Sequence, residues 1–149
     1  TYIKIKGEWY FLYRAVDKYG DTIDFLLRKK LDNAAAKAFF RKSFRQNGRP
    51  DKVAIDKSGA NKLALDKLNE GLEGDDKIEI MQSKYLNNMV EQDHRFIKRR
   101  TRPMLGFKNF NSTRRTIGGI ENVRMIQKGQ ITGANDSKNI YENFCALMA

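Results

Sequence analysis

Two acidic side chains are the residues best placed to do chemistry in this sequence. Asp56 directly follows the short apolar run 53–55, which is predicted as a strand, and Glu91 lies in a basic amphipathic segment predicted as a helix over about 87–102. A strand end and a helix face can hold two carboxylates rigidly. Carboxylate oxygens are the ligands that Mg²⁺ prefers, and paired Mg²⁺ ions promote phosphodiester chemistry. The arrangement is compatible with metal-assisted phosphoryl transfer on a nucleic acid.

Spacing alone leaves a simpler interpretation open. An Asp after a buried strand is often a turn or cap residue. A helical Glu with an Arg four positions later, as in Glu91 and Arg95, is usually a solvated ion pair worth about 0.3 to 0.5 kcal/mol.

Composition favours one folded domain with an acidic polymer as its partner. The chain has 149 residues, of which 40% are hydrophobic and 11% aromatic. Its 29 Lys and Arg residues outnumber 18 Asp and Glu residues and give a net charge of +11, which favours nucleic acid over a membrane. No apolar run approaches the roughly 18 to 20 residues that span a bilayer, and residues 1–6 alternate as a strand does. We expect a cytoplasmic protein.

Several other chemistries find no support in the sequence. Cys145 and His94 are the only residues of their types, so neither an internal disulfide nor a zinc-ligand set is expected. A bound metal would therefore be a hard, oxygen-bound ion. Phosphate-loop and dinucleotide-binding glycine motifs are also missing from the sequence.

Hydrophobic periodicity predicts a mixed α/β fold. Alternating runs at 2–6, 9–16 and 22–27 predict a three-strand antiparallel meander. Asp32 or Asn33 is expected to cap a helix over 34–44, and strands at 53–55 and 77–81 flank a helix at 60–70. This alternation predicts one mixed sheet, in which parallel strands follow the meander and helices flank the sheet. A last helix is expected to begin near Ser112, and residues 131–149 are interpreted as a polar linker with a short apolar tail.

The faces of the predicted helix at 87–102 differ sharply. At 100° per residue, Glu91, Arg95, Lys98 and Arg102 gather on a charged face, opposite an apolar stripe. Asp93 falls within the apolar stripe, where it needs a partner such as Arg100 or a backbone donor.

Four stretches together resemble the DDE (Asp-Asp-Glu) transposases of bacterial insertion sequences: 2–7, 12–17, 85–95 and 102–108. The similarity covers residues 1 to about 130. It implies an RNase H-like catalytic core, similar to that of retroviral integrases, which cleaves DNA and transfers strands. By this resemblance Asp56 is the second Asp of the motif, Glu91 is the Glu, and Lys98 is the basic residue that follows it.

The resemblance also implies cofactors and partners. Two Mg²⁺ (or Mn²⁺) ions are expected, with Asp56 bridging them and Glu91 holding one. The expected partners are transposon terminal repeats, target DNA and further copies of the chain. The family's first Asp is expected to precede Thr1, outside this sequence, as is the helix-turn-helix region. Three acidic residues, Asp17, Asp21 and Asp24, are better explained by turn and strand-surface roles than as substitutes for that Asp.

Cations around these positions are expected to contact phosphates without reading bases. The expected DNA-contacting residues are Lys57, Lys84, Asn87, Asn88, Arg95, Lys98, Arg99, Arg100 and Arg102. A merely solvated basic face is the alternative, and at least one of the two Asn residues is expected to cap the helix.

Three functions therefore compete. The leading interpretation is a transposase catalytic core. An RNase H-like nuclease would use the same metal chemistry without joining DNA. A catalytically dead DNA-binding fragment of a truncated transposase is the third.

Overall fold

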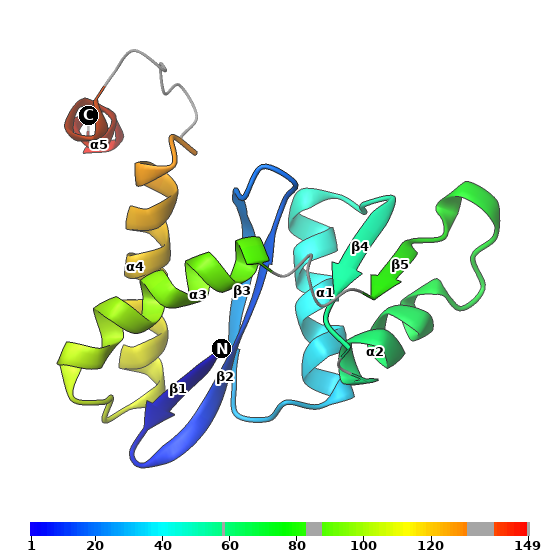
Figure 1. The fold of residues 1–149 in the computed structure, drawn as a ribbon, viewed down its shortest axis with the longest axis horizontal. Helices are drawn as coiled ribbons and strands as arrows, with labels where there is room; N and C mark the ends of the chain where they lie inside the picture. The colour runs from blue at the N-terminus through cyan, green and yellow to red at the C-terminus, as the bar shows by residue number, and fades with distance from the viewer. Residues whose placement is uncertain (58, 83–87, 131–138, 149) are drawn as a thin grey trace.

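The computed structural model describes residues 1–57, 59–82, 88–130 and 139–148 (Figure 1). The strands are β1 (Tyr2–Ile5), β2 (Glu8–Val16), β3 (Thr22–Arg28), β4 (Lys52–Ile55) and β5 (Glu79–Gln82). The α-helices are α1 (Asn33–Asn47), α2 (Gly59–Asn69), α3 (Asn88–Thr101), α4 (Phe110–Gln127) and α5 (Ile140–Met148). Short 3₁₀ helices are η1 (Gly74–Asp76) and η2 (Arg102–Met104). Among the described residues, no helix is both long and apolar enough to cross a bilayer.

The first three strands form the predicted antiparallel meander, in the order β1-β2-β3. The β1–β2 hairpin turns through Lys6 and Gly7, whose φ angles of 49° and 82° give the two left-handed residues of a tight hairpin turn. Alternation places Ile3 and Leu12 on one face of the sheet and Tyr13 on the other.

The predicted parallel pair is also present. Strands β4 and β5 run parallel, with Ile55 opposite Gln82, and α2 connects them. Strand β5 begins later than the expected residue 77. The side chain of Asn69 bonds both backbone groups of Ile78, at 3.0 Å and 2.9 Å, so Ile78 lies outside the strand. The α/β fold class predicted from the sequence is confirmed. In the described part of the chain, however, the meander and the β4–β5 pair form two separate sheets rather than one mixed sheet.

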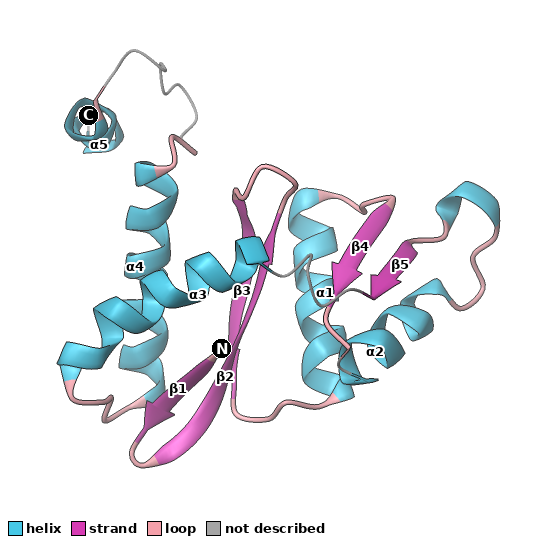
Figure 2. Cartoon of the chain, in the orientation of Figure 1, coloured by secondary structure: helices cyan, strands magenta, loops and turns pink. Residues whose placement is uncertain are grey.

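Helices cover both faces of the meander (Figure 2). On one side, α1 and α2 enclose a cluster that we call the α1 cluster: Tyr13, Ala35, Ala36, Phe39, Phe40, Ile55, Ala64, Leu65 and Ile78. On the other side, α3 and α4 enclose the α3 cluster: Ile3, Ile5, Leu12, Leu27, Ile97 and Ile117. Asp32 caps α1 by accepting a hydrogen bond from the Ala35 amide at 2.8 Å.

The start of α4 differs from the expected cap at Ser112. Asn109 is the cap, because its side chain accepts hydrogen bonds from the amides of Asn111 and Ser112. Helix α4 therefore begins two residues before Ser112. In the segment expected to be a linker and tail, the structure contains α5.

Candidate active site

Asp56 lies directly after β4, as predicted. Ile55, the last residue of that strand, is buried in the α1 cluster and anchors the strand end. The Asp56 side chain is exposed, and its Oδ1 accepts a 3.3 Å hydrogen bond from the side-chain amide of Asn61 on α2. Its carboxylate is thus held at a defined strand end while remaining open to solvent.

Glu91 lies in the first turn of α3, where the helix dipole favours a negative charge. Its side chain is 49% exposed, and its Oε2 lies 3.4 Å from Nδ1 of His94. Lys98 is about two turns further along, half-buried. The inward side of α3 is marked by Asp93 and Ile97, so Glu91 and Lys98 project from another part of the helix surface.

The start of β1 connects these elements. The Thr1 ammonium donates a 2.8 Å hydrogen bond to the carbonyl of Leu12. The pKa of this ammonium is lowered to about 6, mainly by burial. The charges of Lys98 and Arg14 act in the same direction, whereas those of Glu91 and Asp56 raise the pKa. Asp56 and Glu91, from two separate elements, therefore act electrostatically on the same atom.

His94 belongs to the same neighbourhood. The pKa of its imidazole is lowered to about 4, mainly by burial. The charges of the Thr1 ammonium and Arg14 act in the same direction, and the hydrogen bond to Glu91 opposes them. His94 is therefore neutral at pH 7, and its contact with Glu91 is a hydrogen bond rather than an ion pair. Within the described residues, its buried Nε2 and the buried Oγ1 of Thr1 have no hydrogen-bond partner.

These residues fit a hard divalent cation. Mg²⁺ in proteins is usually held by one or two carboxylates together with water and substrate oxygens. Asp56 and Glu91 supply that donor type from rigid elements. Across the described part of the chain, no group of three or more His, Cys, Asp or Glu residues could hold a metal ion. The described chain therefore offers at most a pair of carboxylates.

The predicted DNA-contacting residues lie mainly along α3. Lys57 is exposed beside Asp56, and the exposed cations of α3 and η2 are Arg95, Arg99, Arg100 and Arg102. The guanidinium of Arg100 lies 5.4 Å from the centre of the Phe96 ring. Asn88 is the first residue of α3. Two further predicted residues, Lys84 and Asn87, and the side chain of Asn88 lie outside the part of the chain that the structure describes.

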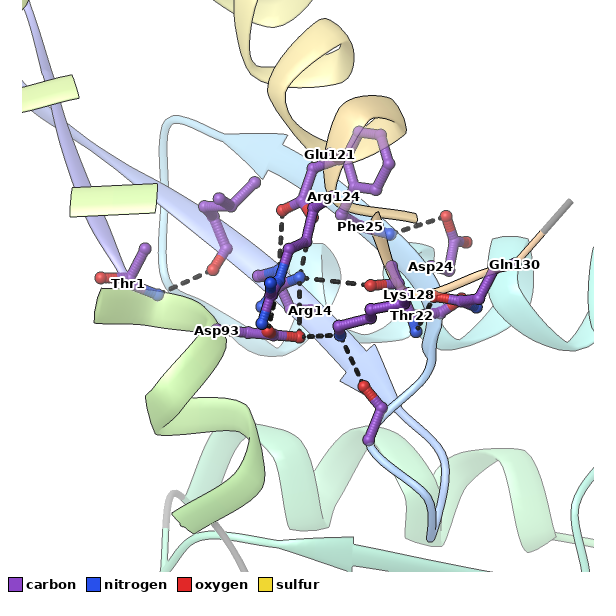
Figure 3. A network of polar contacts seen from close by, with 12 residues as sticks. Thr1, Arg14, Thr22, Asp24, Phe25, Asp93, Glu121, Arg124, Lys128 and Gln130 are labelled. Carbon is purple, nitrogen blue, oxygen red and sulfur yellow. Dashed lines mark hydrogen bonds and ion pairs between the residues drawn. The ribbon is translucent and has the colours of Figure 1, made fainter. Parts of the chain in front are cut away.

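A buried charge network beside the site was not anticipated (Figure 3). We use the name charge network for Arg14, Asp93, Glu121, Arg124 and Lys128. Arg14 on β2 donates two 2.7 Å hydrogen bonds to the carboxylate of Glu121 on α4 and a 3.3 Å bond to Asp93. Asp93 also accepts from Lys128 at 2.6 Å and from Arg124 at 3.3 Å.

The network explains why Asp93 lies within the apolar stripe. Its partners are cations from β2 and from the end of α4. The prediction that Arg100 is its partner is wrong. A weak signal was present in the sequence, since Glu121 follows Ile117 by one helical turn and Arg14 interrupts an apolar strand. Pairing the two residues required the fold. Asp24, expected on the strand surface, is likewise buried and pairs with Lys42.

The two buried carboxylates respond differently to their surroundings. Burial raises the pKa of Asp93, but the hydrogen bond from Lys128 and the charges of Arg14, Lys128 and Arg124 outweigh it, so the net shift is downward. For Glu121 burial dominates and raises the pKa despite the Arg14 contact. Asp93 is thus the firmly ionised member of the network.

Comparison with protein families assigns most of the chain to one family. Residues 1–130 match the model of a DDE domain. The matched range covers the meander, β4, β5 and helices α1 to α4, and includes Asp56 and Glu91.

Curated relatives agree with this match. The chain is 43% identical over 129 residues to the transposase for insertion sequence-like element IS431mec of Staphylococcus aureus. It is equally similar to the transposase for insertion sequence element IS257 in transposon Tn4003, also from Staphylococcus aureus. Each alignment covers 86% of this chain and 55% of the relative, so the chain spans about half the length of these relatives.

Among solved structures, the fold is similar to a chain of the simian T-cell lymphotropic virus intasome in complex with PP2A regulatory subunit B56 gamma. The TM-score is 0.59 at 15% sequence identity, covering 95% of this chain and 50% of that chain. At this identity the similarity concerns the fold, which is RNase H-like, as in retroviral integrases. The chain therefore belongs to the DDE transposases of bacterial insertion sequences.

Proposed function

We propose that this chain forms most of the catalytic domain of a DNA transposase that cleaves transposon ends and joins them to target DNA. The observation that carries the proposal is the match of residues 1–130 to a DDE domain, in a fold that places Asp56 directly after β4 and Glu91 in the first turn of α3. The surplus of positive charge suits a DNA partner.

The two carboxylates, Asp56 and Glu91, are proposed as residues that would hold the metal ions. When bound, Mg²⁺ or Mn²⁺ supplies activation of the attacking oxygen and stabilisation of the leaving oxygen. Asp56 is exposed at the end of β4. Lys98 is proposed to contact a DNA phosphate beside Glu91.

The family's first Asp is proposed as a third carboxylate that joins Asp56 and Glu91, as the family resemblance implies.

The exposed cations Arg95, Arg99 and Arg102 are proposed to bind the DNA backbone together with Lys57 and Lys98. The set also includes Lys84, Asn87, Asn88 and Arg100. Each true phosphate contact adds about one unit to the slope of log affinity against log salt. Lys98→Ala should therefore weaken binding to transposon-end DNA and lower that slope. An unchanged affinity and slope would remove Lys98 from the interface.

Assembly of several copies on paired DNA ends, in the bacterial cytoplasm, is proposed by family analogy alone.

The decisive assay uses the intact protein, precut transposon-end DNA, a target plasmid and Mg²⁺, and measures both strand joining and strand hydrolysis. Glu91→Gln should reduce joining by about a hundredfold or more, since even residues that only support metal ligands cost 10 to 100-fold. Glu79→Gln is the matched control, because Glu79 is an exposed glutamate of β5 paired with Lys52 on the surface. It should retain full activity.

The same assay separates the competing functions. Hydrolysis without joined product would support an RNase H-like nuclease. Equal joining by wild type and Glu91→Gln would contradict the catalytic assignment. Absence of both reactions in the intact wild-type protein, with DNA binding retained, would support a catalytically dead DNA-binding protein.

A further inference from the structure

We propose that Asp93 is a positioning residue for Glu91: the charge network fixes the rotation and axial position of α3 and thereby the position of the Glu91 carboxylate. This inference rests on the proposed function, because it concerns the same metal-binding pair. Asp93 itself is buried and points toward the cations of the charge network (Figure 3).

The first argument is that one of the two buried side chains of α3 is a carboxylate, while the partly buried Phe96 packs against the α3 cluster. Among its described side chains, only Asp93 and Ile97 are buried, at 3% and 0% exposure. They lie one helical turn apart and define the line along which α3 meets the rest of the molecule. Ile97 packs in the α3 cluster. Half of the buried anchor is therefore a carboxylate.

The second argument is the directionality of the Asp93 contacts. Its Oδ2 accepts from Lys128 at 2.6 Å and from Arg14 at 3.3 Å, while its Oδ1 accepts from Arg124 at 3.3 Å. Both oxygens are thus occupied by cations that come from β2 and from the end of α4. A rotation or slide of α3 would break these charge-assisted hydrogen bonds, whereas an aliphatic contact tolerates small shifts.

The cations are themselves held in place. Arg14 is fixed by its paired hydrogen bonds to Glu121. Lys128 also donates at 2.6 Å to the carbonyl of Gly20 in the β2–β3 turn. Gln130 bonds both backbone groups of Thr22, at 2.9 Å and 3.0 Å. Asp93 is therefore tied to a frame built from β2, β3 and the end of α4.

The third argument is the position of Asp93 relative to Glu91. Two residues apart on a helix, their side chains point about 200° apart. Fixing Asp93 on the inner side therefore fixes Glu91 on the outer side, beside His94. Arg124 adds a second contact to α3, because its guanidinium lies 4.7 Å from the centre of the Phe96 ring.

The test measures Mn²⁺ binding by isothermal titration of the intact protein, without reference to activity. Asp93→Asn keeps the shape of the side chain and removes its charge. We expect it to weaken Mn²⁺ binding by about tenfold or more, in the range seen when residues that support metal ligands are lost. Ile97→Val shortens the other buried anchor of α3 and is the matched control, expected to bind Mn²⁺ within about twofold of wild type.

Thermal denaturation of each variant separates positioning from general loosening. A purely structural role predicts that Mn²⁺ affinity follows the loss in melting temperature, equally for Asp93→Asn and Ile97→Val. That result, or unchanged affinity in Asp93→Asn, would overturn the proposal.

A second variant covers the case in which Asp93→Asn fails to fold. Lys128→Met removes one of the three cations that contact Asp93, and we expect it to weaken Mn²⁺ binding by a smaller factor than Asp93→Asn. Unchanged affinity in folded Lys128→Met would then overturn the inference.

Glu91→Gln distinguishes this inference from the function on which it rests. If Glu91→Gln loses Mn²⁺ binding while Asp93→Asn retains it, the proposed function stands and the positioning role fails. If the intact wild-type protein shows no Glu91-dependent Mn²⁺ binding, both are overturned.

Discussion

The two sides of the meander are closed by different physical means. On the α1 side, the core is apolar and aromatic: Tyr13 contacts Phe39 at 5.6 Å between ring centres, and Phe39 contacts Phe40 at the same distance. On the α3 side, a small aliphatic cluster is completed by the buried charge network. The side that carries Glu91 is thus the side fixed by directional, charge-assisted contacts.

This difference suggests a division of labour. Burying apolar area stabilises a fold without demanding one orientation of each side chain. Buried ion pairs contribute less net stability because their desolvation offsets their attraction, yet removing one partner is strongly destabilising. We infer that the α1 side mainly provides stability and anchors the strand end that carries Asp56, and that the α3 side sets the position of Glu91.

The largest effect is expected from Arg14→Met. This change leaves the carboxylates of Glu121 and Asp93 without their shared buried cation, so the free energy of unfolding should fall by about 3 to 5 kcal/mol. Urea denaturation at pH 7 measures it. A loss below about 1 kcal/mol would show that the network is not energetically coupled to the fold.

A comparable loss of stability is expected from a substitution on the α1 side. Leu65→Ala empties part of the α1 cluster, where Leu65 is fully buried, and should reduce stability by about 2 to 5 kcal/mol. Mn²⁺ affinity of the folded intact protein should nevertheless fall by less than in Asp93→Asn, because the charge network that positions Glu91 stays intact. A large loss of Mn²⁺ affinity would contradict the division between the two sides.

The pH dependence of Asp93→Asn is the next largest effect. Because the folded-state pKa of Asp93 lies below its unfolded value of about 3.9, its ionised form stabilises the fold above that pH and the contribution disappears as the pH falls through the folded pKa. Asp93→Asn should therefore cost about 1.5 to 3 kcal/mol at pH 7 and progressively less below pH 4. Urea denaturation of both proteins across pH 3 to 7 measures the difference, and a constant loss would contradict the assigned role.

Glu121→Gln should show the opposite trend. The folded-state pKa of Glu121 lies above its unfolded value of about 4.3, so its favourable contribution is complete below that pH and is lost as the pH rises through the folded pKa. The loss of stability in Glu121→Gln should therefore shrink from acid to neutral pH. Urea denaturation across the same pH range measures the direction of this trend. A loss of stability that grows with pH would show that the charge of Arg14 affects the Glu121 pKa more than burial does.

The smallest effect is expected on the surface. Lys52 and Glu79 form a 2.9 Å ion pair across the β4–β5 ladder, with side chains 52% and 61% exposed. Lys52→Ala should change the free energy of unfolding by no more than about 1 kcal/mol, because water and salt screen such pairs. A larger change, measured by urea denaturation, would mean that exposed charges matter here as much as buried ones.

Local patterns in the sequence predicted the elements well. Strand alternation gave the meander, the Asp32 cap gave the start of α1, and amphipathic spacing gave α3 to within about one residue. These features depend on neighbours in the chain. The family resemblance supplied the roles proposed for Asp56, Glu91 and Lys98, whose spacing alone also fitted turn and ion-pair roles.

Features set by tertiary contacts were missed. Arg14 and Glu121 are separated by most of the chain, so only the fold reveals that they pair. The Asn69 side chain delays the start of β5, and Asn109 replaces Ser112 as the cap of α4. In each case a polar side chain found a backbone or charged partner that hydrophobic periodicity does not report.

The central claim, that Asp56 and Glu91 hold divalent cations between them, can be tested most directly with Fe²⁺ in place of Mg²⁺ in the intact protein. Ascorbate and peroxide then generate hydroxyl radicals that cut the backbone close to the metal, and mass spectrometry maps the cuts. We predict cuts near both residue 56 and residue 91, all of them lost in Glu91→Gln. Cuts near only one of the two residues, or cuts that persist in Glu91→Gln, would contradict the shared site.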